Sequence, residues 1–314
     1  MSVTISMMNW KGGVGKTTLT LNLAAGLAHK DYNVLIVDLD PQCNLSFLAL
    51  GLTGYIKRAY KEQKPTLKNL FDAYFENEDI TAENIIQSKT VRSSPDEVFN
   101  RLDVILSHQE LVLLDLKLAR NQKAGKDHRE TTKFEIEKIS VIDRLLQQVR
   151  DNYNFILLDC PPNVNLVTQN AFFASDFYIV PAIPDFLSTI GISLIDDFMG
   201  KFNKDFSSMC EYAEMEYKYK KTKFGGIIFN MVNEYSGQPK QTHNEQIQLI
   251  KKQFPDKVFD NYLTGGDGIA TASSIYVPIF AHADLPRSNE NAKKQAGLLY
   301  KIIDELINKL AVVS

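Results

Sequence analysis

Two lysines and two threonines enclose a glycine-rich segment near the start of the chain. Residues 11–18 read Lys-Gly-Gly-Val-Gly-Lys-Thr-Thr. An apolar run over residues 3–8 comes before them, and residues 17–29 carry apolar side chains at helical spacing. A glycine-rich loop between a strand and a helix is typical of phosphate-binding sites, because glycine lets backbone N–H groups approach the phosphate oxygens. We therefore predict a nucleoside triphosphate site here.

Each part of this loop has a chemical task in that prediction. The following helix adds free N–H donors and the positive end of its dipole. Lys16 stands where a lysine reaches the β- and γ-phosphates, and Thr17 stands where a hydroxyl coordinates Mg²⁺. The residues expected to contact the nucleotide are Lys11, Gly12, Gly13, Val14, Gly15, Lys16, Thr17 and Thr18.

The front of the loop departs from the general P-loop pattern. That pattern has glycine five residues before Gly15, where this chain has Trp10, and Lys11 follows. A lysine at the front points away from its own phosphate cradle, so we expect Lys11 to contact something outside the subunit. The alternative is a solvated surface lysine.

Carboxylates follow two further apolar runs. Residues 34–37 lead into Asp38-Leu39-Asp40-Pro41-Gln42, and residues 155–158 lead into Asp159. Parallel sheets bind ligands at the carboxyl ends of their strands, so we expect these acids to lie near the loop. Asp159 has the Walker B arrangement, which holds Mg²⁺ directly or through water. The alternative for Asp159 is a cap on the next helix, and for Asp40 it is a turn residue before proline.

Together these residues resemble the ParA/MinD family of P-loop ATPases. Residues 11–18 look like its deviant Walker A motif, although Trp10 stands where a small or polar residue is usual, and residues 38–42 match its Asp-x-Asp-Pro-Gln motif. The resemblance implies that Lys11 crosses a dimer interface to the partner's phosphates and stabilises developing charge, as an arginine finger does. It also implies that Asp40 aligns or activates the attacking water and that Asp38 supports the metal shell. Residues 160–162 resemble the switch segment.

The base contact is predicted from two later positions. Asn230 ends an apolar run, and its amide can pair with the adenine edge, which the resemblance supports. The alternative is a turn asparagine. Pro286, in Asp-Leu-Pro-Arg-Ser, resembles the family loop that packs beside adenine.

A net charge of −3 gives no general attraction to nucleic acid, so DNA binding requires a local basic face. The resemblance implies basic residues late in the chain, and we select Arg287, Lys293 and Lys294. An ATP-dependent dimer would double this patch and make non-specific DNA binding sensitive to salt. The alternative is a solvated face. A ParB-like or other adaptor that stimulates slow hydrolysis is the further partner implied.

Apolar runs alternate with helical patterns along the chain, which predicts an α/β fold with a mostly parallel twisted sheet and helices on both faces. We expect one P-loop domain over residues 1–314, with surface insertions near 51–64, 119–133 and 201–223. The expected strands are residues 3–8, 34–38, 102–106, 155–158, 177–181 and 226–231, and the clearest expected helices are residues 17–29, 67–75, 110–118, 139–149 and 298–310.

Composition favours a cytoplasmic protein, and the resemblance implies that it associates with the nucleoid. No run of 18 apolar residues exists, and the first residues lack the basic region of a signal peptide. Three well-separated cysteines, Cys43, Cys160 and Cys210, fit neither a disulfide framework nor a CxxC metal pair.

Two other functions remain open from sequence. A MinD-like ATPase acting at a membrane needs an amphipathic basic tail, and residues 309–314 are too short and too poor in charge for one. A metabolic enzyme on the same fold needs either two suitably placed cysteines for an iron–sulfur cluster or a substrate pocket. Cys160 has no evident mate, and no substrate pocket is identifiable from the sequence.

Overall fold

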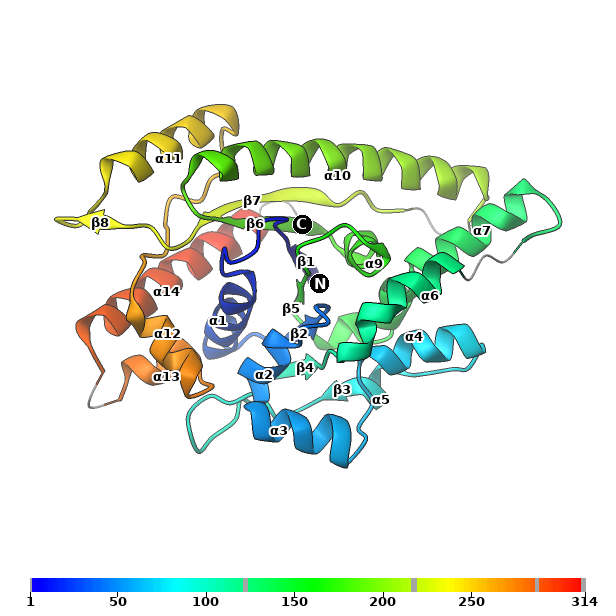
Figure 1. Ribbon diagram of the computed structural model, residues 1–314, viewed down its shortest axis with the longest axis horizontal. Helices are drawn as coiled ribbons and strands as arrows, with labels where there is room; N and C mark the ends of the chain where they lie inside the picture. Colours follow the sequence, from blue (N-terminus) through cyan, green and yellow to red (C-terminus); the bar gives the residue numbers. More distant parts are fainter. Residues whose placement is uncertain (1, 121–123, 216–218, 286–287, 312–314) are drawn as a thin grey trace.

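One seven-stranded sheet forms the centre of the molecule (Figure 1). The computed structural model describes residues 2–120, 124–215, 219–285 and 288–311. In spatial order the strands are β3 (Ile86–Gln87), β4 (Leu102–Ile105), β2 (Val34–Asp38), β5 (Phe155–Asp159), β1 (Val3–Met7), β6 (Phe177–Ala182) and β7 (Lys223–Phe229). Only the β3–β4 pair is antiparallel among these strands. The mostly parallel α/β fold predicted from sequence is confirmed.

Helices cover both faces of the sheet, and a short hairpin of β8 (Glu234–Tyr235) and β9 (Gln238–Pro239) lies apart from it. The helices are α1 (Lys16–His29), α2 (Asn44–Leu50), α3 (Leu52–Ile56), α4 (Leu67–Glu76), α5 (Ala82–Ile85), α6 (Leu114–Arg120), α7 (His128–Ile139), α8 (Val141–Gln147), α9 (Leu166–Ala174), α10 (Phe186–Tyr212), α11 (Gln241–Gln253), α12 (Asp267–Ser274), α13 (Ile279–Ala283) and α14 (Glu290–Ala311). Short 3₁₀ turns span Gln109–Leu113 and Arg150–Asn152, and a π-helical turn spans Lys57–Lys61.

Two apolar cores separate the helix layers from the sheet. On β2, Val34 and Ile36 pack with α1, α13 and α14, whereas Leu35 and Val37 pack with α4, α8 and α9. Strand side chains alternate between faces, so a strand buried on both faces is apolar at every position. This explains why the central strands read as continuous apolar runs in the sequence.

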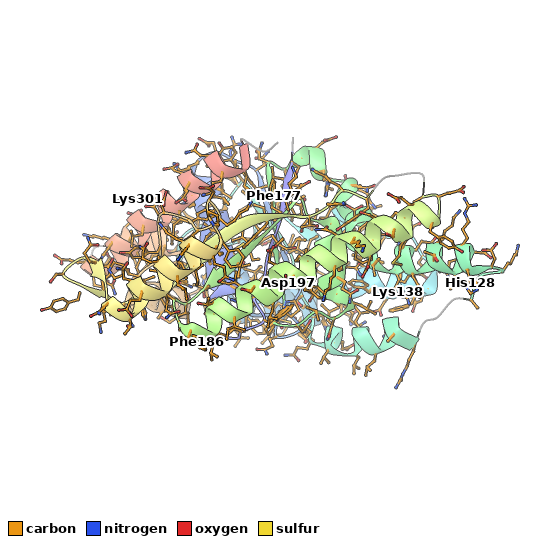
Figure 2. All side chains as sticks on the ribbon, turned by 90° about the horizontal axis from the view of Figure 1, so that it is seen from above. His128, Lys138, Phe177, Phe186, Asp197 and Lys301 are labelled. Atoms are coloured by element: carbon orange, nitrogen blue, oxygen red, sulfur yellow. The ribbon has the colours of Figure 1, made fainter. Side chains whose placement is uncertain are left out.

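The parallel register brings the predicted acids together. Asp159 at the end of β5 is paired with Met7 of β1 on one side and with Asp38 of β2 on the other. In Figure 2, Phe177 marks the amino edge of the sheet, because it is the first residue of β6. Phe186 follows the end of β6 and marks the carboxyl edge. The carboxyl edge is therefore where the loop before α1 and both acid-ended strands meet.

Helix α10 is the longest of the described helices, and the sequence analysis did not predict it as one element. It has 27 residues, which makes it about 40 Å long. Phe202, Phe206 and Cys210 are buried on its inner face, so the first part of the region 201–223 packs against the core. Residues 51–64 contain α3 and the π-helical turn, and residues 119–133 include the end of α6 and the start of α7. Within the described residues, none of the helices combines the length and apolar character that a membrane crossing requires.

Candidate functional site

The loop between β1 and α1 has the backbone that phosphate binding needs. Gly13 and Gly15 adopt left-handed conformations, with φ of +75° and +80°, and Gly15 is the N-cap of α1. A Cβ atom on Gly15 would lie 2.2 Å from the Asn230 amide nitrogen. Glycine is therefore required at Gly15 both for its backbone angle and for space.

Lys16 begins α1 and is almost fully buried, with 8% of its surface exposed. Burial lowers the pKa of its ammonium group, and the negative charges of Asp159 and Asp40 partly oppose that effect. A partly desolvated cation beside free helix N–H groups is a strong site for an anion of high charge. The predicted phosphate-contacting lysine therefore lies in the environment that its role demands.

Asp159 is buried at the end of β5, and one of its two carboxylate oxygens accepts no hydrogen bond from the described residues. Its Oδ1 accepts a hydrogen bond from the Thr20 hydroxyl at 3.2 Å, while Oδ2 has no partner among the described residues. Burial raises the pKa of Asp159 to about 7, opposed by the nearby Thr17 hydroxyl and by the charge of Lys16. An unpartnered buried carboxylate oxygen next to the Thr17 hydroxyl suits Mg²⁺, which takes oxygen ligands.

The described residues contain no cluster of three or more His, Cys, Asp or Glu side chains placed to hold a metal. A magnesium site of the nucleotide type needs only one or two protein oxygens, which act together with phosphate oxygens and water. Thr17 and Asp159 fit that donor set.

Asp38 lies next to Asp159 and is fully buried, but its oxygens are occupied. Oδ2 accepts from the Ser46 backbone N–H at 2.8 Å and from the Ser46 hydroxyl at 2.7 Å, and Oδ1 accepts from the Asp40 N–H at 3.1 Å. Burial, reinforced by the neighbouring Asp159, raises the pKa of Asp38 to about 8. In this structure Asp38 anchors the chain segment that follows it, and a direct metal contact would require these bonds to rearrange.

Asp40 is half-buried at the same edge, in a turn over residues 38–42 that we call the aspartate turn. Its Oδ1 accepts from the Gln42 N–H at 2.9 Å. The Ser107 hydroxyl, just beyond β4, donates to the Asp40 carbonyl at 2.7 Å, and the Ser107 N–H donates to the Ser46 hydroxyl at 2.9 Å. Ser46 and Ser107 were missed from sequence, because nothing in their local patterns indicates this contact.

Lys11 is half-buried and forms an ion pair with Asp185 of the same chain. Asp185 is the N-cap of α10 and accepts from the Ser188 N–H at 2.8 Å. Burial alone would raise the pKa of Asp185, yet the hydrogen bonds from Lys11 and Ser188 together lower it. The sequence prediction placed Lys11 toward another subunit. In the single chain its ammonium group is held by Asp185 instead.

Trp10, which precedes Lys11, packs edge-on against Phe198 of α10, with ring centroids 5.7 Å apart. It is partly buried against the core that lies under α9 and α10. The unusual tryptophan therefore ties the front of the P-loop to α10, which also carries the Lys11 partner at its start.

The base-contact residues have a different status. The Asn230 amide donates to the Val14 carbonyl at 3.0 Å and accepts from the Met231 N–H at 2.8 Å. Both ends of the amide are thus occupied, so Asn230 supports the P-loop, and an adenine contact would require these bonds to change. Pro286 lies outside the described residues.

The predicted basic residues are only partly brought together. Arg287 lies outside the described residues. Lys293 and Lys294 are exposed in the first turn of α14, and Lys294 forms an ion pair with Glu234 of the β8–β9 hairpin. Of the three, Lys293 is therefore the one that the structure places exposed with no recorded ion pair.

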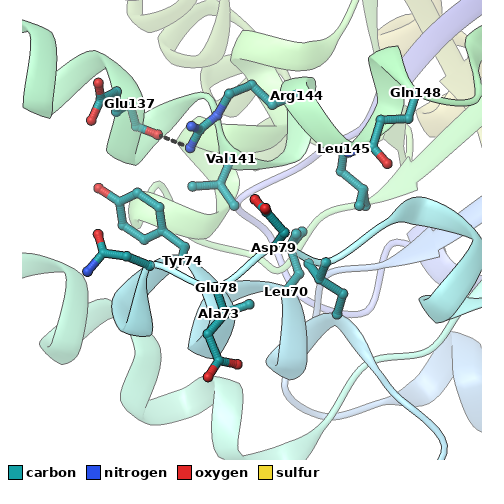
Figure 3. Close-up of a pocket in the computed structure, with 12 residues that line it drawn as sticks. Leu70, Ala73, Tyr74, Glu78, Asp79, Glu137, Val141, Arg144, Leu145 and Gln148 are labelled. Atoms are coloured by element: carbon teal, nitrogen blue, oxygen red, sulfur yellow. Dashed lines mark hydrogen bonds between the residues drawn. The ribbon is translucent and has the colours of Figure 1, made fainter.

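A separate cavity lies away from this edge (Figure 3). It has a volume of about 360 Å³ and is lined by α4, α7 and α8, including Tyr74 and Arg144. The Arg144 guanidinium donates to the Glu137 carbonyl at 3.0 Å across one side. None of the residues predicted for the nucleotide lines it.

Comparison with known sequences agrees with this arrangement. A family model described as an AAA domain matches residues 2–211. An uncharacterised protein of Methanocaldococcus jannaschii is 30% identical over 81% of each chain. The sporulation initiation inhibitor protein Soj of Bacillus subtilis is 28% identical over 92% of this chain and 95% of its own.

Solved structures share the fold. An ATP complex of a McdA variant from Cyanothece aligns with a TM-score of 0.71 at 15% identity, covering 99% of this chain and 96% of that one. The septum site-determining protein MinD of Pyrococcus horikoshii, complexed with Mg-ADP, aligns with a TM-score of 0.61 at 20% identity, covering 100% and 98%. At these identities the likeness concerns the fold. The family model matches most of the chain, and the relatives align over most of both sequences. Together with the P-loop at the carboxyl edge of the sheet, these matches show that this chain belongs to the ParA/MinD family of P-loop ATPases.

Proposed function

We propose that this protein is a ParA-type switch that partitions or positions DNA or another cargo. In this proposal it binds Mg·ATP at the P-loop edge, forms a dimer through the bound nucleotide, and binds DNA without sequence preference. Slow hydrolysis, accelerated by a ParB-like or other adaptor, then releases the two copies. The proposal extends the family assignment to the specific roles of Lys11, Asp40 and Asp159.

The buried, unpartnered Oδ2 of Asp159 is the observation that carries the proposal. It lies at the carboxyl edge beside Thr17, and Lys16 supplies a desolvated positive charge next to it. A buried carboxylate without a partner is costly unless a ligand occupies it. Thr17 and Asp159 would hold Mg²⁺, which when bound neutralises phosphate charge and polarises the phosphoryl oxygens.

Hydrolysis needs a group that orients water and a group that stabilises charge on the γ-phosphate. Asp40 is suited to the first task, because it is partly exposed while its main chain is fixed by Asp38 and Ser107. Lys11 is suited to the second task once it leaves Asp185, since its side chain is about one-third exposed at the edge. In the dimer each Lys11 would act on the nucleotide of the other copy.

DNA binding is proposed from the exposed Lys293 together with Arg287 and Lys294. A dimer places two such sets on one particle, and each phosphate contact releases counterions. Lys294 would have to leave Glu234 to take part. A steep fall of DNA affinity with rising salt is the expected signature.

Size-exclusion chromatography with light scattering on Asp40→Ala tests the proposal. This variant should retain ATP, because Asp40 acts on water, and its mass should double when Mg·ATP is added. Lys16→Ala provides the matched control, because it should stay monomeric under the same conditions. If the Asp40→Ala protein binds ATP and remains a monomer, the switch is refuted.

A further inference from the structure

The first turns of α10 expose an unusual set of large apolar side chains. Phe186 and Leu187 are each 64% exposed, Ile190 is 46% exposed and Leu194 is 52% exposed. Their spacing puts all four within one face of the helix, opposite the buried Ile192. We call these four exposed residues the α10 stripe. Contiguous exposed apolar side chains commonly mark an interaction site.

The stripe starts where Lys11 is held. Phe186 directly follows Asp185, and the Asp185 carboxylate binds the Lys11 ammonium group. Figure 2 shows Phe186 at the carboxyl edge of the molecule, while Asp197 of the same helix lies farther from that edge. Ile190 and Leu194 follow at about 6 Å and 12 Å along the axis, given a rise of 1.5 Å per residue.

The same face of α10 changes character beyond the stripe. After Leu194 and as far as Asp205, its large exposed side chains are charged, namely Asp197, Lys201, Lys204 and Asp205. A face that only met solvent would have no reason to be apolar at one end and charged at the other. The cluster of apolar side chains lies at the end nearest the P-loop, and the next large exposed apolar side chain of the helix, Tyr212, stands alone at the far end. Whatever covers the cluster therefore approaches at the nucleotide edge.

We propose that a second copy of this chain covers the α10 stripe when two copies close on the nucleotide. This inference rests on the proposed function and names the apolar part of its dimer interface. Phe186 and Leu187 form the core of that contact, with Ile190 and Leu194 toward its rim.

The position of Lys11 favours a second copy over another partner. For Lys11 to reach the phosphates of a second copy, the surface around it must face that copy. Phe186 and Leu187 directly follow Asp185, which binds Lys11, and both are exposed, so they belong to the surface that a second copy would approach. In a twofold dimer the same patch is used by both copies.

Interface size supports the same choice. A stable interface buries about 800 Å² per partner around an apolar core. One lysine and a charged loop cannot supply such a core, whereas a phenylalanine and three aliphatic side chains can. An adaptor that binds the finished dimer would still find these residues already covered.

The first test measures dimer affinity by analytical ultracentrifugation with a non-hydrolysable ATP analogue and Mg²⁺. The double substitution Phe186→Ser with Leu187→Ser should weaken dimerisation at least about tenfold, as removal of central interface side chains does. Tyr212→Ser is the matched control, because Tyr212 is 56% exposed at the far end of the same helix. It should change the affinity by less than about twofold.

A second measurement does not depend on weakening the dimer. The native cysteines Cys43, Cys160 and Cys210 are buried, so Leu187→Cys introduces one readily reactive thiol. The measured quantity is the rate of maleimide labelling of this thiol. The ATP analogue should lower that rate, and more strongly at higher protein concentration, because dimerisation increases with concentration. Tyr212→Cys should be labelled equally fast with or without the analogue.

The outcomes separate this inference from the function on which it rests. If the unsubstituted chain fails to dimerise with the analogue, the proposed function fails. If it dimerises while Leu187→Cys reacts at the monomer rate, the inference is overturned and the dimer stands. Protection that appears only after a purified adaptor is added would also overturn it, because the adaptor would then be the occupant.

Discussion

The phosphate loop and the aspartate turn lie at the same edge of the sheet but are held in place differently. The phosphate cradle takes its shape from consecutive residues, chiefly the left-handed Gly13 and Gly15, and Asn230 supports it at Val14. Only the front of the loop is tied to a distant element, because Trp10 and Lys11 contact α10 and its N-cap. The aspartate turn depends on Ser46 and Ser107, which come from α2 and from the end of β4.

This difference has a functional meaning. A loop whose backbone is fixed locally keeps its anion-binding N–H groups in place whatever the rest of the edge does. A turn held by side chains from separate elements can shift when those elements shift. We infer that nucleotide binding is the robust property of this edge and that hydrolysis is the adjustable one.

The largest expected effect separates the two regions cleanly. Asp40→Asn should lower kcat for ATP hydrolysis by about 10²- to 10⁴-fold, the usual contribution of a catalytic base or water-orienting group. The dissociation constant for ATP should stay within about twofold, because the phosphate loop is untouched. Phosphate release and calorimetric titration measure the two quantities. A similar loss of ATP affinity would contradict the assignment of binding to the phosphate loop and of hydrolysis to the aspartate turn.

The reverse result is expected from the phosphate loop. Lys16→Ala should weaken ATP binding by about 10- to 100-fold, because it removes a charge-assisted contact to phosphate. The melting temperature without nucleotide should not fall, since burial already disfavours the charged form of Lys16 and lowers its pKa. Fluorescent-nucleotide titration and thermal unfolding check both parts. An unchanged affinity for ATP would show that Lys16 does not contact the phosphates.

The same contrast explains what could be predicted from sequence. The placement of residues 11–18, Asp40 and Asp159 at one edge of the sheet could be predicted, because a loop motif is local and because the ends of parallel strands must converge. Ser107 was missed because its contact with Asp40 joins segments 67 residues apart. Asp185 was missed for the same reason, since it lies 174 residues from Lys11.

Helix α10 was missed for another reason. Pro184 stands just before its N-cap and Gly191 lies in its second turn, and the charged residues 201–223 were interpreted as a partly helical surface insertion. A helical stripe was nevertheless present in the sequence, because Ile195, Met199 and Phe202 follow the i, i+4, i+7 spacing. Its exposed apolar face depends on packing that no local pattern reveals.

A smaller effect tests the support of the aspartate turn. Ser107→Ala removes the hydrogen bond to the Asp40 carbonyl and should lower kcat about fivefold, with ATP affinity unchanged, as expected for the loss of one partly buried hydrogen bond. Ser107→Thr keeps the hydroxyl and should retain most of the activity. Steady-state kinetics of both variants provide the measurement. Equal loss in the two variants would indicate a packing defect instead.

The smallest effect concerns the support of the phosphate loop. Asn230→Ala removes the bond to the Val14 carbonyl and should weaken ATP and GTP binding alike, each by about threefold to fivefold. Competition titrations with both nucleotides measure the ratio. A loss confined to ATP would instead assign the amide to the adenine edge.

The central claim is that each active site is shared between two copies, and mixing two inactive variants tests it most directly. Lys11→Ala keeps Asp40, and Asp40→Ala keeps Lys11, so a mixed dimer contains one complete site if Lys11 acts across the interface. An equal mixture should then recover about a quarter of the wild-type ATPase rate, since half the dimers are mixed and each has one complete site. If mixed dimers form and the rate stays at the level of the separate variants, Lys11 acts within its own chain and the account is contradicted.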